Sequence, residues 1–201
     1  MIELAPPVQL YLIRHPRPRV ALGMCYGRLD VGVDTEAIAS AARVVPQRIP
    51  TAVLRQSSMY TSPLSRCTAF AQAIAYPRTA IIAEDLIEMD FGAWEGRLWE
   101  NVPRDELDRW ARDVWNFRPG GGENARAVAQ RWERWLARLQ DSGNDFAIGV
   151  THAGMIRVAL AQSERVPRAD AVQTPIEYGS VHYFEIPDPS SVPLQRPQAR
   201  A

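Results

Sequence analysis

The chain has 201 residues, of which 46% are hydrophobic, and its 23 basic and 23 acidic side chains cancel to a formal net charge of zero. This length suits one domain with a sizeable core, and the balanced charge gives no support to a nucleic-acid or anionic-membrane partner. No apolar run approaches the roughly 20 residues of a membrane span, and the N-terminus lacks the basic start and long apolar stretch of a signal peptide, so we expect a cytoplasmic protein.

The first half of the chain alternates short apolar runs with helical segments. Apolar runs typical of buried strands occupy 8–13, 57–62 and 79–83. A helix is predicted from Asp34 or Thr35 to about residue 45, because either residue can cap it. A second helix is predicted over 64–75, where Pro63 suits the first turn.

Residues 84–122 differ in composition from the rest of the chain. This stretch holds four of the six tryptophans among many charged residues, and three consecutive glycines close it. We expect a loop followed by one or two helices that form a small cap over the functional site. The tryptophans are interpreted as packing residues rather than as a platform for stacking a ligand.

The second half of the chain continues the alternation. Val128, Trp132 and Trp135 belong to an apolar stripe with three- and four-residue spacing that predicts a helix over about 123–140. A strand at 146–151, a helix at 154–162, a strand at 181–186 and a disordered tail at 187–201 complete the prediction. These crossovers indicate an α/β fold in one domain over 1–186, with a largely parallel sheet covered on both faces.

Polar side chains stand at the ends of the predicted strands. Arg14 and His15 follow the first apolar run, His152 follows the run at 146–151, and Arg66 lies in the first turn of the helix after the second run. Ligands of open α/β sheets bind outside the carboxyl ends of the strands, so we expect these side chains to meet there. Two imidazoles beside arginines predict phosphate chemistry with histidine as nucleophile.

Cleavage of a phosphomonoester requires a nucleophile, cationic donors for the equatorial oxygens and an acid for the leaving oxygen. All 23 basic side chains are arginines, so a phosphate pocket here must use planar guanidinium donors. The acid is expected to be Glu88, with Asp90 and Glu95 as alternatives. Neither the two cysteines nor the histidines have a metal-ligand spacing.

Five motifs occur in one order between residues 8 and 186: Leu-Ile-Arg-His, Ser-Pro-Leu-Ser-Arg-Cys, Glu-Met-Asp-Phe-Gly-Ala-Trp-Glu-Gly, Pro-Gly-Gly-Gly-Glu-Asn and Val-Thr-His-Ala-Gly. In this order they resemble the histidine phosphatase superfamily, in its phosphoglycerate mutase-like branch. The resemblance implies a three-layer α/β/α sandwich, with a mostly parallel central sheet, one antiparallel edge strand and a small helical cap. It implies a small phosphorylated substrate and no metal or organic cofactor, and it leaves the choice between monomer and homodimer open.

The same resemblance assigns roles to the candidate site residues. It implies that His15 is the nucleophile and becomes phosphohistidine, while Arg14, Arg66 and His152 bind the phosphoryl group. Glu88 matches the residue that protonates the leaving alkoxide and then activates water.

The residue after His15 departs from the usual pattern, because Pro16 stands where most members have glycine. The segments His-Pro-Arg-Pro and Cys-Tyr-Gly-Arg resemble the α-ribazole phosphatases of cobalamin biosynthesis. Proline removes one amide donor, so binding of the phosphate would depend on side chains such as Arg28. The alternative interpretation of Arg28 is a residue that forms a salt bridge. Glu123 matches a glutamate with a structural or substrate-linked part.

The resemblance therefore predicts a phosphatase that acts on α-ribazole 5′-phosphate. Two other readings stay open. One is a broad-specificity or sugar-phosphate phosphatase, or a phosphoglycerate mutase-like enzyme. The other is a non-catalytic module that binds a phosphorylated ligand.

Overall fold

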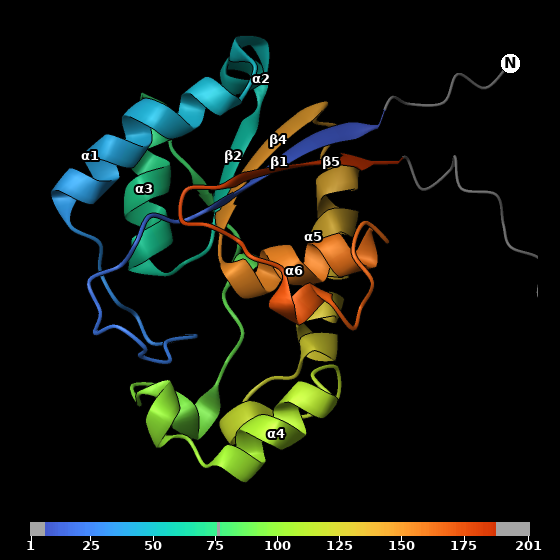
Figure 1. Ribbon diagram of the computed structural model, residues 1–201. Helices are drawn as coiled ribbons and strands as arrows, with labels where there is room; N and C mark the ends of the chain where they lie inside the picture. Colours follow the sequence, from blue (N-terminus) through green and yellow to red (C-terminus); the bar gives the residue numbers. More distant parts are fainter. Residues whose placement is uncertain (1–6, 76, 188–201) are drawn as a thin grey trace, which may run out of the picture.

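The computed structural model describes residues 7–75 and 77–187, which form a five-stranded sheet between helices (Figure 1). The strand order is β3-β2-β4-β1-β5. The strands are β1 (Val8–Arg14), β2 (Ser58–Thr61), β3 (Ile81–Ile82), β4 (Phe146–Thr151) and β5 (Val181–Ile186). The first four run parallel, and β5 pairs antiparallel with β1 at the edge. In register, Leu12 lies opposite Gly149 of β4 and His182 of β5.

Helices cover both faces of the sheet, because alternate residues of a strand point to opposite sides. Leu10 and Leu12 pack with α5 (Ala125–Asp141) and α6 (Ala153–Gln162). Tyr11 and Ile13 pack with the other layer, which consists of α1 (Thr35–Val44), α2 (Thr51–Gln56) and α3 (Ser65–Ala75). Figure 1 shows these two helical layers on either side of the strands. The predicted three-layer α/β/α sandwich with one antiparallel edge strand is confirmed.

The segment between β3 and α5 has an apolar cluster of its own. It contains α4 (Arg104–Arg112) and four short 3-10 helices: η2 (Glu84–Leu86), η3 (Gly92–Trp94), η4 (Trp99–Asn101) and η5 (Pro119–Gly121). Trp94 is 2% exposed and packs with Cys25 and Val102. Trp99 and Trp110 stack with their ring centroids 5.9 Å apart. Tryptophan packing therefore holds this segment together.

Several boundaries differ from the sequence-based prediction. The third strand shortens to Ile81–Ile82, and the segment after Pro50 forms α2, a short helix that was not predicted. The long helix begins at Ala125 because Asn124 caps it, with its side-chain oxygen accepting from the Ala127 amide at 2.9 Å. Beyond residue 187, the predicted tail at 187–201 lies outside the described residues.

The described part of the chain has no helix that is long and apolar enough to span a membrane. Among the same residues, no three His, Cys, Asp or Glu side chains gather in a group that could hold a metal ion.

Candidate active site

The two histidines predicted to meet lie side by side at the carboxyl edge of the sheet. Arg14 and Thr151 are register partners at the ends of β1 and β4, and the His15 amide donates to the Thr151 carbonyl at 3.0 Å. The ring centroids of His15 and His152 are 5.1 Å apart. Parallel pairing of two neighbouring strands thus brings together imidazoles that are far apart in sequence.

His15 is held as a neutral imidazole of defined tautomer. Its ring is 2% exposed, and its Nδ1–H donates to the Pro16 carbonyl at 2.6 Å. Burial lowers the pKa of His15 to about 3, and the positive charges of Arg66 and Arg14 act in the same direction. The remaining nitrogen, Nε2, therefore carries a free lone pair at neutral pH.

Arg66 and His152 form a buried pair beside His15, and both side chains are 0% exposed. Arg66 Nε donates to His152 Nδ1 at 3.3 Å, which leaves the Nε2–H of His152 to donate to Ser62 Oγ at 2.7 Å. Burial, followed by the neighbouring His15 and Arg66, lowers the pKa of His152 well below its ordinary value. This histidine is therefore neutral as well.

The guanidinium of Arg66 is anchored by the loop after β1. Its NH2 group donates to the Gly27 carbonyl at 2.5 Å, and its NH1 group donates to the Leu29 carbonyl at 2.9 Å. Gly27 permits a close approach, because a Cβ there would lie 2.1 Å from the carbonyl oxygen of Met89. The Glu95 carboxylate joins the loop to the same segment by accepting from the amides of Arg28, Leu29 and Phe91.

Arg14 lies against a tyrosine ring. Its guanidinium carbon is 3.7 Å from the ring centroid of Tyr178, and its NH1 group donates to the Ile176 carbonyl at 2.5 Å. Its Nε is buried and has no hydrogen-bond partner among the described residues. A buried donor without a partner is costly, so this atom is suited to meet an anion.

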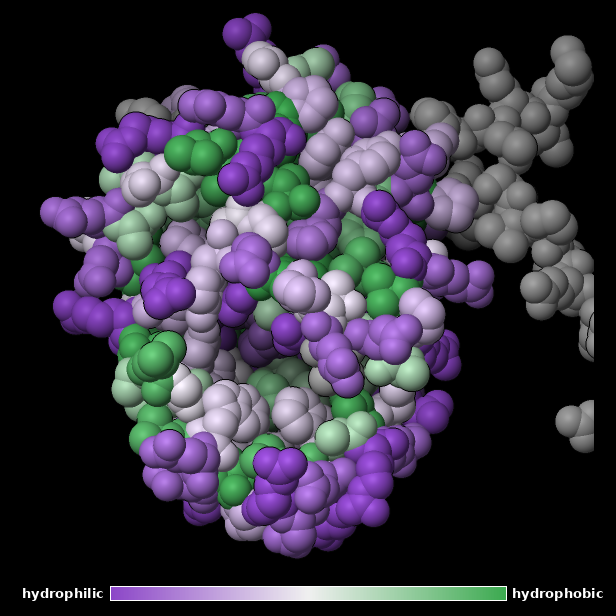
Figure 2. Space-filling model, in the orientation of Figure 1, coloured by the Kyte–Doolittle hydropathy of each residue, from purple (hydrophilic) through white to green (hydrophobic). Residues whose placement is uncertain are grey.

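A pocket of about 380 Å³ opens beside these groups. Its polar lining includes Arg14, His15, Glu88 and Arg157, and its aromatic lining consists of Tyr26, Phe91, Trp99 and Tyr178. Arg66 and His152 lie buried beside His15 and do not line it. Figure 2 shows that this face of the molecule is hollowed above the segment that carries α4.

Among the three candidate acids, Glu88 alone lines this pocket. Its Oε1 accepts from the Met89 amide at 2.8 Å, and its Oε2 accepts from the Gly154 amide at 3.1 Å. Asp90 instead caps its own turn by accepting from the Gly92 amide at 2.7 Å. Glu95 is occupied by the three loop amides described above.

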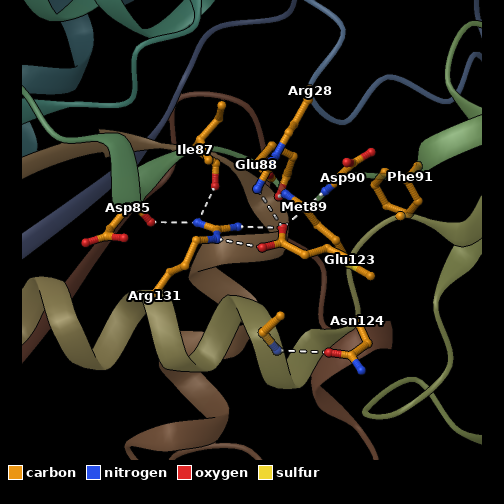
Figure 3. A network of polar contacts seen from close by, with 12 residues as sticks. Arg28, Asp85, Ile87, Glu88, Met89, Asp90, Phe91, Glu123, Asn124 and Arg131 are labelled. Carbon is orange, nitrogen blue, oxygen red and sulfur yellow. Dashed lines mark hydrogen bonds and ion pairs between the residues drawn. The ribbon is translucent and has the colours of Figure 1, made fainter.

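An ion-pair network fixes the backbone around Glu88 (Figure 3). Arg131 makes a two-pronged salt bridge with Glu123, with both nitrogen–oxygen distances 2.9 Å. The NH1 group of Arg131 donates to the carbonyls of Asp85 and Ile87, at 2.7 and 3.0 Å. Burial by itself raises the pKa of Glu123, but the hydrogen bond and charge of Arg131 outweigh it, so the pKa is lowered. Glu123 therefore occupies a structural position.

Arg28 belongs to the same network. Its NH2 group pairs with Glu123 at 3.1 Å, and its Nε donates to the Glu88 carbonyl at 3.4 Å. Arg28 is absent from the pocket lining. Of the two interpretations of this residue, the salt bridge is the one that the structure contains, and phosphate binding by Arg28 stays a prediction.

Several pocket residues were missed by sequence reasoning. Arg157 lines the pocket, and its Nε donates to the Thr174 carbonyl at 3.0 Å. Its position three residues after Gly154 on α6 places both on one helical face, a signal that was present in the sequence. Tyr26 and Tyr178 come from two irregular loops, which carry no periodic signal.

The sequence matches, over residues 10–194, the family model described as the histidine phosphatase superfamily, branch 1. The chain belongs to this superfamily. A bifunctional protein of Mycobacterium tuberculosis is 33% identical over 142 residues, which cover 66% of this chain and 37% of that protein. The chain therefore spans little more than a third of the length of that relative.

Two further similarities concern named phosphatases. The adenosylcobalamin/α-ribazole phosphatase of Salmonella typhimurium is 30% identical over 103 residues, which cover 49% of this chain and 50% of that enzyme. The crystal structure of a phosphoserine phosphatase from Entamoeba histolytica, in complex with 3-phosphoglyceric acid, superposes with a TM-score of 0.77 and 21% identity. It covers 90% of this chain and 93% of that one, and it supports the fold.

Proposed function

We propose that this member of the histidine phosphatase superfamily is a phosphomonoesterase that acts through a phosphohistidine intermediate and needs no metal. The observation that carries the proposal is the state of His15. Its Nδ1 is engaged with the Pro16 carbonyl, and its neutral ring offers the Nε2 lone pair beside two guanidinium groups, Arg14 and Arg66. A neutral imidazole in a positively charged site is suited to attack a phosphoryl group.

The proposed reaction has two steps. In the first, His15 Nε2 attacks phosphorus, the bond from phosphorus to the ester oxygen breaks, and protonated Glu88 gives its proton to the leaving alkoxide. In the second, the Glu88 carboxylate takes a proton from water, the water oxygen attacks phosphorus, and the phosphorus–nitrogen bond breaks to release phosphate. Arg14 and Arg66 stabilise the charge on the equatorial oxygens in both steps, and His152 does so once its Nε2–H turns from Ser62 Oγ to the phosphoryl group.

We further propose that residues 84–122 act as a cap within one domain over 1–186. This segment contributes Glu88, Phe91 and Trp99 to the pocket lining, so it supplies both the acid and part of the leaving-group environment. A small phosphorylated substrate and a cytoplasmic location belong to the same proposal, with monomer and homodimer both open.

The favoured substrate is α-ribazole 5′-phosphate. The His-Pro-Arg-Pro and Cys-Tyr-Gly-Arg segments support it, as does the 30% identity to the Salmonella enzyme. An aromatic pocket wall suits a planar base on the leaving group. A broad-specificity phosphatase or a mutase-like enzyme is the second candidate. Arg157 favours it, because neither of its two terminal nitrogens is bonded to a described residue and both are suited to bind a carboxylate.

The decisive experiment compares His15→Ala with His182→Ala, which removes the histidine of β5 outside the pocket. With p-nitrophenyl phosphate, we expect His15→Ala to lose turnover and His182→Ala to retain it. Wild-type turnover by His15→Ala would refute the mechanism. A kcat/KM panel of α-ribazole 5′-phosphate, phosphoserine, a sugar phosphate and 3-phosphoglycerate, the last with and without bisphosphoglycerate, then separates the substrates. Phosphate binding without any turnover would instead indicate a non-catalytic module.

A further inference from the structure

Two tyrosines from separate loops form a hydrogen bond between their hydroxyl groups in the wall of the pocket. The phenol oxygens of Tyr26 and Tyr178 are 2.6 Å apart. Both residues line the pocket, and the Tyr178 ring centroid lies 5.8 Å from that of His15. The pair therefore lines the same pocket as His15, with the Tyr178 ring next to the imidazole.

Each ring faces one of the two arginines proposed to bind phosphate. The guanidinium carbon of Arg14 is 3.7 Å from the Tyr178 centroid, and that of Arg66 is 5.4 Å from the Tyr26 centroid. Guanidinium groups are attracted to aromatic faces within about 6 Å, which restricts their orientation. Through its mutual hydrogen bond, the tyrosine pair connects the surroundings of the two arginines.

The pair has one hydrogen-bond donor to spare. Two phenols carry two O–H groups, and the bond between them uses one. Neither hydroxyl bonds to any other described residue. Burial, followed by the hydrogen bond shared with Tyr178, raises the pKa of Tyr26, so that hydroxyl stays protonated. The second O–H is free for a ligand.

Several of the donors expected at the phosphoryl site are absent or already bonded. Pro16 has no amide hydrogen at the position after the nucleophile. Arg28 is occupied by Glu123, and Arg66 uses one N–H of each terminal nitrogen on the Gly27 and Leu29 carbonyls. A phosphoryl group exposes three equatorial oxygens, which are stabilised by several donors aimed at them.

We infer that the Tyr26–Tyr178 pair is part of the phosphoryl-binding site and donates its free O–H to an equatorial oxygen of the bound group. The inference rests on the proposed function. It replaces the missing main-chain donor at position 16 with a side-chain donor from two other loops.

The test uses Tyr26→Phe, Tyr178→Phe and the double variant, because phenylalanine keeps each ring and removes only the hydroxyl. Tyr183→Phe is the control, since its hydroxyl bonds Glu185 on β5 outside the pocket. The measurements are kcat/KM with p-nitrophenyl phosphate and the inhibition constants of orthovanadate and inorganic phosphate. Thermal unfolding checks that each variant is folded.

The two hydroxyls should be partly interchangeable. Each single variant keeps one O–H, so we expect losses of only a few-fold. The double variant has none, so we expect a loss of about 10- to 100-fold in kcat/KM and in vanadate affinity, more than the product of the single losses. Phosphate, which does not mimic the transition state, should lose less affinity than vanadate. A double variant whose loss does not exceed the product of the single losses would overturn the inference.

Failure of the proposed function gives a different result. If the wild-type protein hydrolyses no phosphomonoester, the function is wrong, and direct binding of vanadate and phosphate, measured by calorimetry, still tests the tyrosine pair. If the wild-type protein is active and the double variant equals it in every measurement, the pair alone is wrong.

Discussion

Replacing Gly154 by alanine tests whether the position of the Glu88 carboxylate controls catalysis. A Cβ at position 154 would lie 2.3 Å from Glu88 Oε1, about 1 Å inside ordinary van der Waals contact. Gly154 is fixed in the first turn of α6, whereas the carboxylate ends a flexible side chain. The carboxylate should therefore move by about 1 Å, and a displacement of that size can cost on the order of 100-fold in rate.

This variant should lose activity without losing stability. Alanine is favoured over glycine in a helix by up to about 1 kcal/mol, so the melting temperature should not fall. We expect kcat/KM to fall about 100-fold with alkyl phosphomonoesters, whose alkoxides need protonation, and less with p-nitrophenyl phosphate, whose phenolate leaves more easily.

A double-mutant cycle with Glu88→Gln supplies the control. Both substitutions should act through one carboxylate, so Gly154→Ala should cost almost nothing in the Glu88→Gln background. The reasoning is refuted if Gly154→Ala keeps the wild-type rate. It is equally refuted if the substitution still costs about 100-fold when Glu88 has already been replaced.

Three further predictions concern stability. Burial lowers the pKa of His15 to about 3, whereas the imidazole of the unfolded chain titrates near 6.5. As the pH falls between these values the unfolded state binds the proton first, so His15 lowers the free energy of unfolding by ~1.4 kcal/mol per pH unit. Urea unfolding at about pH 7 and pH 5 should show a smaller acid loss for His15→Asn than for the wild type. Gly27→Ala places a Cβ 2.1 Å from a backbone carbonyl that cannot easily yield, and should destabilise by about 2 kcal/mol in the same assay, which an unchanged midpoint would contradict. Glu123→Gln leaves the buried Arg131 without its full counter-charge and should lower the free energy of unfolding by about 3 kcal/mol. Asp105→Asn, in an exposed pair, should lower it by less than ~0.5 kcal/mol. Equal losses in the two variants would disprove the role of burial.

The sheet could be predicted because each buried strand is a short apolar run ended by a proline, a glycine or a polar residue. The runs at 8–13 and 146–151 are buried on both sides, so their pattern needed no knowledge of their partners. The helix over 51–56 could not be found in this way. Its six residues follow Pro50 and include only one buried side chain, Val53, so they show no apolar stripe long enough to predict a helix.

The meeting of the two histidines at one edge of the sheet was predictable for a topological reason. Parallel strands end at one edge, so His15 and His152 had to meet once both runs were identified as neighbouring strands. Contacts between irregular loops have no such rule. The pairing of Tyr26 with Tyr178 and the ion pair of Arg28 with Glu123 depend on how loops fold over the edge, which no spacing in the sequence encodes.

The hydrogen bond from His15 to the Pro16 carbonyl has a chemical consequence for any covalent adduct. Because Nδ1 keeps its hydrogen, a phosphoryl group taken up by the ring must bond to the distal nitrogen, giving the τ isomer of phosphohistidine. The τ and π isomers differ in their phosphorus resonance and in recognition by isomer-specific antibodies. The isomer of a trapped adduct would therefore show directly which ring nitrogen the hydrogen bond to the main chain leaves free for the ligand.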